Sequence, residues 1–72
     1  MELKDVSAEG ATIVLQRDEV SFLCAAITET IHAVSEREFK LRTQETPARA
    51  QEIWDQLIDI LDKIRDSAIK PE

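Results

Sequence analysis

The last third of the chain, residues 46–69, reads TPARAQEIWDQLIDILDKIRDSAI, and this stretch decides the fold. Thr46 is a preferred helix N-cap residue, and Pro47 suits the first helical position because its missing N–H would have no helical partner there. Apolar residues then recur every three or four positions, which is the spacing of one side of an α-helix. The stretch therefore predicts a helix over 46–69, with Pro71 just beyond its end.

Five carboxylates share the side of this helix that lies opposite its apolar residues. They are Glu52, Asp55, Asp59, Asp62 and Asp66, and together they are called the acidic rib. At about 100° per residue they fall within an arc of roughly 80°. Neighbouring like charges should weaken the helix by about 0.2–0.5 kcal/mol per pair. Basic neighbours should offset this repulsion in the pairs Arg49–Glu52, Asp59–Lys63, Asp62–Arg65 and Asp66–Lys70.

The rib has two open interpretations, an ordinary solvated face or a docking surface for a basic protein partner. A metal site is not expected, because a straight helix spreads its carboxylates along its length and cannot wrap them around an ion. The apolar arc of the same helix spans roughly 180°, whereas covering one face of a small core needs a stripe nearer about 100°. The surplus could cover the rest of the domain or pair with a second copy of the chain.

Aromatic and aliphatic side chains near the rib complete a candidate binding surface. Trp54 sits toward the Ile58 edge of the apolar arc, and an aromatic residue at such a margin is a typical interface anchor. Phe39, on the connector that precedes the helix, is similar. The candidate partner-binding residues are therefore Glu52, Asp55, Asp59, Asp62, Trp54, Ile58 and Phe39.

Residues 18–35 predict a second long helix. Asp18 is well placed as its N-cap, and Glu19 in the first turn is favoured by the helix dipole. The apolar residues Val20, Leu23, Cys24, Ile27, Ile31 and Val34 then follow helical spacing. Cys24 lies within this stripe, which predicts a buried and unreactive thiol.

Residues 1–17 predict a β-hairpin with strands near 3–6 and 11–16. The second strand holds the β-branched run Thr12-Ile13-Val14, whereas Leu3 and Val6 in the first do not share the parity of a strand face. Gly10 is the one glycine of the chain and is expected in the connection, at a positive φ. Because an isolated hairpin is marginal in water, it should pack on a helix or extend a partner's sheet.

Residues 36–45 predict a short helical elbow between the two long helices. Ser35 followed by Glu38 fits a capping box, and Glu38 can pair with Arg42 one turn later. The expected fold is one α+β domain, mostly α, spanning residues 1–72. It has an N-terminal β-hairpin followed by two long antiparallel helices joined by the elbow.

Composition excludes several classes of partner and site. The net charge of −6, from 15 acidic and 9 basic residues, argues against nucleic acid and anionic membranes as partners. No secretion signal or long apolar run is evident, and the cysteine is unpaired, so we expect a cytoplasmic protein. One cysteine and one histidine cannot supply a common zinc site, and no cofactor is expected.

Catalysis is not expected either. Cys24 and His32 are eight residues apart on one helix, roughly 12 Å along its axis, which is too far for proton transfer. Glu29 and His32 have the i,i+3 spacing of a di-iron ligand pair, but such sites need a second pair and two further glutamates. His32 at the border of the apolar stripe is better explained as an ordinary surface histidine.

Residues 12–61 resemble a group of small bacterial proteins with a short strand, an acidic pair, an apolar helix and Glu-Phe-x-x-Arg before a final helix. The matching residues are Val14-Leu15, Asp18-Glu19, Phe22-Leu23, Ala26-Ile27, Glu29 and Glu38-Phe39-Lys40-Leu41-Arg42. Members usually have glycine soon after this arginine, where the present chain has Thr43-Gln44. Some such proteins resemble immunity proteins of contact-dependent growth inhibition systems, which bind and neutralise a cognate toxin domain. That resemblance implies a basic protein partner, since nuclease toxins tend to present basic active sites.

The sequence therefore favours a small acidic, non-catalytic protein-binding module, with toxin neutralisation as its most specific version. The alternative is a structural or regulatory homodimer that uses the wide apolar face of the last helix.

Overall fold

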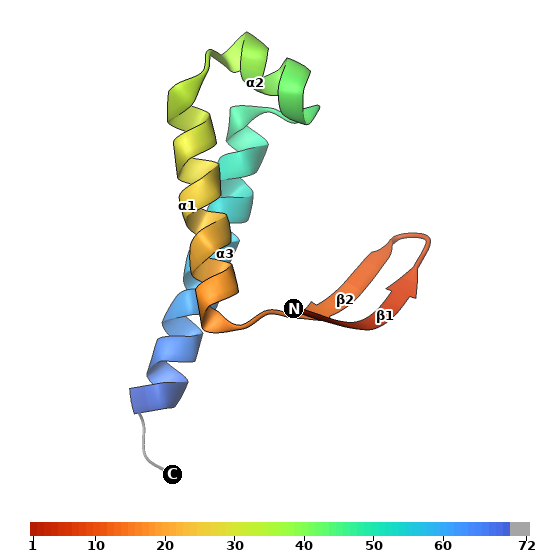
Figure 1. The fold of residues 1–72 in the computed structure, drawn as a ribbon, viewed down its shortest axis with the longest axis vertical. Coiled ribbons are helices and arrows are strands. Elements are labelled where there is room, and N and C mark those ends of the chain that lie inside the picture. Colours follow the sequence, from red (N-terminus) through yellow and green to blue (C-terminus); the bar gives the residue numbers. More distant parts are fainter. Residues whose placement is uncertain (70–72) are drawn as a thin grey trace.

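The computed structural model describes residues 1–69 and is mostly helical. Its elements are β1 (Glu2–Ser7), β2 (Gly10–Val14), α1 (Arg17–Ala33), α2 (Glu36–Thr43) and α3 (Pro47–Ile69). α1 and α3 run antiparallel side by side, α2 joins them across one end, and the hairpin projects near the other end of α1 (Figure 1). The expected fold class is confirmed. Lys70, the predicted partner of Asp66, and the Pro71 stop lie outside the described residues.

Two helix starts follow the sequence prediction. The Thr46 hydroxyl accepts a hydrogen bond from the Arg49 backbone N–H at 3.1 Å, and Pro47 is the first residue of α3. The Ser35 hydroxyl accepts one from the Glu38 N–H at 3.2 Å at the start of α2. Each bond satisfies a backbone donor that has no partner inside its own helix.

The start and end of α1 differ from the prediction. The N-cap is Gln16 and not Asp18, because the Glu19 carboxylate accepts the Gln16 backbone N–H at 2.8 Å and so caps the helix from its third position. Glu19 also pairs with the Met1 amino group at 2.7 Å. The helix ends at Ala33 and not at Ser35, since Ser35 takes the extended conformation that an N-cap of α2 requires.

The Glu19 contacts lower the pKa of that carboxyl, first through the Gln16 N–H and then through the Met1 amine. A carboxyl whose folded pKa is depressed adds stability above its unfolded pKa and loses it as the pH falls through the folded value. We therefore expect the melting temperature to fall more steeply below about pH 4.5 in the wild type than in Glu19→Gln. Thermal melts between neutral and acid pH measure this difference. Glu29→Gln, an exposed change on the same helix, should keep the wild-type slope.

The end of α2 is held in a strained backbone conformation. Gln44 has φ 62° and ψ 21°, and its N–H donates to the Lys40 carbonyl at 2.8 Å. Glycine adopts this left-handed conformation without the clash that a Cβ causes.

Gln44→Gly should therefore stabilise the protein, by about 0.5–1 kcal/mol. Urea titration followed by helical circular dichroism measures the free energy of unfolding. The matched control is Gln56→Gly, an exposed position inside α3, which should destabilise by about 0.5–1 kcal/mol. Two changes of equal sign would contradict the explanation by backbone conformation.

The core is very small. Four side chains among the described residues are buried: Val20 at 0% exposed, Phe39 at 4%, Cys24 at 7% and Ala50 at 8%. Burial of Cys24 was predicted and is confirmed, and it raises the pKa of the thiol. Val20 and Cys24 come from α1, Phe39 from α2 and Ala50 from α3, so each of the three helices contributes to the core.

The hairpin is irregular and stands apart from the helices. Leu3 pairs with Ile13 and Val6 with Ala11, and the register shift at Lys4 leaves that residue without a cross-strand partner. This β-bulge places Leu3 and Val6 on one face with Ile13, which explains their mismatched parity. Gly10 is the first residue of β2 and has no positive φ, so its predicted role in the connection is wrong.

Of the two arrangements expected for the hairpin, packing on a helix is not found in the described part of the chain, and extension of a partner's sheet stays a prediction. Neither strand contacts a helix within residues 1–69 (Figure 1). Leu3, Val6 and Ile13 consequently remain 61%, 66% and 44% exposed.

Candidate protein-binding surfaces

The acidic rib lies along α3, with all five of its carboxylates exposed. Toward its C-terminal end, Lys63 pairs with Asp59 at 2.9 Å and Arg65 with Asp62 at 3.4 Å, as predicted. The hydrogen bond and charge of Asp59 raise the pKa of Lys63. All these groups are well exposed, so each pair contributes little to stability.

The N-terminal half of the rib is compensated more weakly. Arg49 approaches Glu52 at 3.9 Å, near the limit for an ion pair, and Asp55 accepts a neutral hydrogen bond from the Gln51 amide at 3.2 Å. This half of the rib therefore keeps more of its negative potential.

Trp54 and Ile58 are both half-buried on α3. Trp54 lines a small hollow with Thr28, Ile31, His32 and Gln51. The indole thus packs partly against α1 on the flank where polar side chains also gather. Its partial exposure leaves Trp54 and Ile58 accessible beside the rib.

Phe39 does not belong to an accessible surface. It is 4% exposed, at the junction of α2 with the two long helices. Its burial conflicts with the prediction that Phe39 is one of the partner-binding residues. The structure turns Phe39 into the core and leaves Leu41 72% exposed.

A second apolar surface lies on the flank of α1 and α3 away from Trp54. Near the elbow it forms a groove of about 250 Å³ whose lining includes Leu23, Ala26, Ile27 and Ile53. Ile60 and Ile64 continue the same side of α3, seven and eleven residues after Ile53. These six residues, Leu23, Ala26, Ile27, Ile53, Ile60 and Ile64, are called the open face.

The open face was not identified from the sequence as a site. The wide apolar arc of the last helix signalled it, but a helical wheel cannot say which part of the arc faces α1. In the structure Ala50 is buried, whereas Ile53 and Ile64 are half-buried and Ile60 is 43% exposed. The apolar side of α3 is therefore wider than its contact with α1, and it extends beyond that contact on both sides. One side is the Trp54 flank and the other is the open face.

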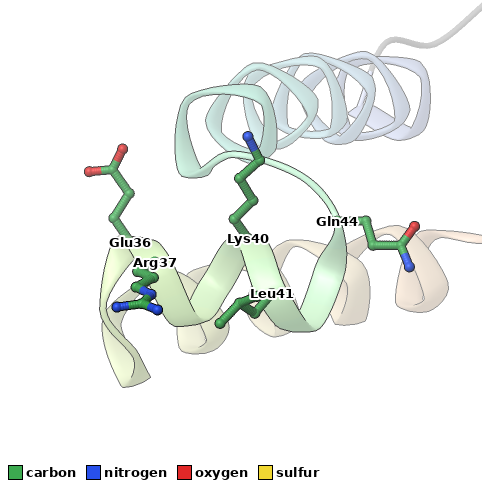
Figure 2. A pocket seen from close by; sticks show the side chains of 5 residues that line it. All are labelled: Glu36, Arg37, Lys40, Leu41 and Gln44. Atoms are coloured by element: carbon green, nitrogen blue, oxygen red, sulfur yellow. The ribbon is translucent and has the colours of Figure 1, made fainter.

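The outer side of α2 forms a wide, shallow hollow lined by Glu36, Arg37, Lys40, Leu41 and Gln44 (Figure 2). The hollow is large only because it opens directly to solvent. Figure 2 shows Lys40 and Leu41 pointing in different directions from the helix. Side chains that diverge from a convex helix do not converge on one ligand, so this hollow is not a candidate binding site.

Other chemistry finds little support within the described part of the chain. Glu29 and His32 are both exposed on α1. No group of three metal-binding side chains is assembled among residues 1–69. None of the helices described combines the length and apolar character needed to cross a membrane.

Comparison of the chain with models of known protein families, with curated proteins and with solved structures finds no match. The two candidate surfaces, the acidic rib and the open face, therefore carry the functional argument.

Proposed function

We propose that this chain is a non-catalytic protein-binding module. The observation that supports it is the size of the core: four side chains are buried among the described residues of a chain that is 43% hydrophobic. Apolar surface of this extent on a small protein marks sites of protein interaction. A bound protein would bury the apolar side chains that the chain leaves exposed.

In its most specific version the module is an immunity protein, and its partner is a toxin domain with a basic surface. The exposed acidic rib supports this version, because a row of carboxylates attracts a basic partner and raises its association rate. The half-buried Trp54 and Ile58 lie beside the rib and would supply the apolar anchor. In the cell this version places the protein in the cytoplasm of a bacterium.

The test uses the protein encoded immediately upstream, which we expect to contain a toxin domain. Charge reversal at Asp55, Asp59 and Asp62, all to lysine, should slow association at low salt about tenfold or more and leave the helical content unchanged. Stopped-flow or biosensor kinetics give the association rate. The matched control reverses Asp5, Glu9 and Glu29, which are equally exposed but lie off the rib. Equal rates for both triple variants would remove the steering role of the rib, and an upstream product without affinity would remove the immunity assignment.

Self-association is the second candidate function, as a structural or regulatory homodimer. The arrangement of α1 and α3 favours it, because the two helices form a single layer whereas a stable domain is built from two packed layers. Size-exclusion with light scattering at micromolar concentration decides it. A monomer at that concentration would contradict this candidate and would leave the toxin-binding proposal standing.

A further inference from the structure

We propose that the open face is covered by the open face of a second copy, forming a four-helix bundle in which α1 of each chain lies against α3 of the other. This inference rests on the proposed protein-binding role of the chain and names the partner of one of its two surfaces. The acidic rib and the hairpin stay outside the bundle.

The area that the chain leaves exposed fits a partner of this size. The accessible surface is 5988 Å², whereas a compact monomer of 8.2 kDa exposes about 4,500 Å². That excess is shared between the projecting hairpin and the apolar flanks of α1 and α3, and it is larger than the roughly 800 Å² that each partner buries in a standard interface.

The shape of the chain agrees with a missing layer. The radius of gyration is 14.5 Å, against about 11 Å for a compact domain of this length. The long axis of 48 Å follows the paired helices, and the shortest dimension is 16 Å (Figure 1). A second two-helix layer would complete the pairing of apolar faces that bundles require.

The open face is the flank that suits a buried interface. All six residues of the open face are aliphatic. The one polar residue that α1 adds to the groove lining is Thr30. The Trp54 flank instead carries Thr28, His32 and Gln51. Burying those groups would require a hydrogen-bond partner for each of them, which an identical flank is poorly able to supply.

Ile53, Leu57, Ile60 and Ile64 recur at spacings of four, three and four on α3. This is the heptad pattern of helices that pack at a shallow angle in bundles and coiled coils. These residues give α3 an apolar stripe on the side of the open face, which another helix could contact while α3 keeps its contacts with α1.

Charges at the rims of the open face select the arrangement of the two chains. On α3 the rim positions are Arg49, Gln56 and Lys63, seven residues apart, and on α1 they are Glu19, Ala26 and Ala33. Antiparallel packing of α3 on its own copy would place Arg49 beside Lys63 at both ends. Packing α3 on α1 of the other copy separates Arg49 from Lys63 and places Lys63 near the level of the other chain's Glu19, whose carboxylate also binds the Met1 amine.

Light scattering with one substitution on the open face is the first part of the test. The wild type should be a dimer at micromolar concentration. Ile60→Glu should weaken the dimer about 100-fold or more, because it buries an unpaired charge in the interface. Its helical content should survive, since Ile60 is 43% exposed within one chain. Leu41→Glu, on the outer side of α2, is the matched control and should remain a dimer.

Disulfide cross-linking of the full chain distinguishes the two arrangements even if Ile60→Glu fails to fold. A two-fold axis parallel to the helices keeps each residue at its own height, so Ala26 of one chain should lie near Gln56 of the other. A mixture of Ala26→Cys and Gln56→Cys chains should therefore form mixed disulfides under mild oxidation. Gln56→Cys alone should not, whereas packing of α3 on α3 would cross-link it. The wild type, whose thiol is buried, gives the background.

Each outcome has one meaning. A wild-type monomer, or a dimer that Ile60→Glu leaves intact, overturns the inference. Efficient cross-linking of Gln56→Cys alone overturns the α1-on-α3 arrangement. Neither result touches the binding of a toxin domain at the acidic rib, which is measured separately through association rates.

Discussion

Phe39→Ala is expected to leave the chain largely unfolded. Phe39 is 4% exposed and joins α2 to both long helices, and removing a buried phenylalanine ring costs about 3–5 kcal/mol. A single core in a chain of this size supplies only about 3–5 kcal/mol in total. Circular dichroism at neutral pH should therefore show a large loss of helical signal before any denaturant is added.

The matched control is Phe22→Ala. Phe22 lies on α1 and is 70% exposed, so the same chemical change should alter the free energy of unfolding by no more than about 0.5 kcal/mol. Similar losses from both variants would mean that Phe39 does not hold the elbow against the long helices.

Val20→Ala is expected to be the second most damaging change. Val20 is 0% exposed, and losing two buried methyl groups costs about 2–3 kcal/mol including the cavity left behind. The better helix propensity of alanine returns about 0.5 kcal/mol of this. Urea denaturation followed by helical circular dichroism should show a midpoint well below that of the wild type.

Val6→Ala is the corresponding control, because Val6 is 66% exposed on β1. Its cost should stay below about 1 kcal/mol and should be confined to the hairpin, which does not contact the described helices. A midpoint shift of the helical signal as large as that of Val20→Ala would show that the hairpin and helices fold as one cooperative unit.

The helices were predictable because their signals are local. Thr46-Pro47 and Ser35 mark two helix starts through side-chain caps that depend only on neighbouring residues. α1 began one residue before the predicted cap, because a glutamate at the third helical position replaced the N-cap side chain. Asp18 could serve as the N-cap, or Glu19 could bind the backbone N–H of an N-cap at Gln16. Local sequence preferences do not decide between these two helix starts.

Tertiary placement was not predictable in the same way. Phe39 and Leu41 have equal apolar character on the elbow, and the direction of the chain after Val34 decided which one is buried. The open face was likewise hidden, because its identity depends on the rotation of α3 against α1. The parity conflict of Leu3 and Val6 did carry information, since it marked the bulge at Lys4.

That bulge bears on the risk of fibril formation. A two-stranded hairpin has two open edges, and apolar strands with open edges are templates for stacking into cross-β aggregates. At Lys4 the ladder is interrupted, β1 bends, and a charged residue occupies the outer edge. A strand that paired with the β1 edge would lose register at Lys4 and would have to remove water from the charged Lys4 side chain. The bulge therefore protects the β1 edge of the hairpin, where Leu3 and Val6 are exposed, from pairing with another strand.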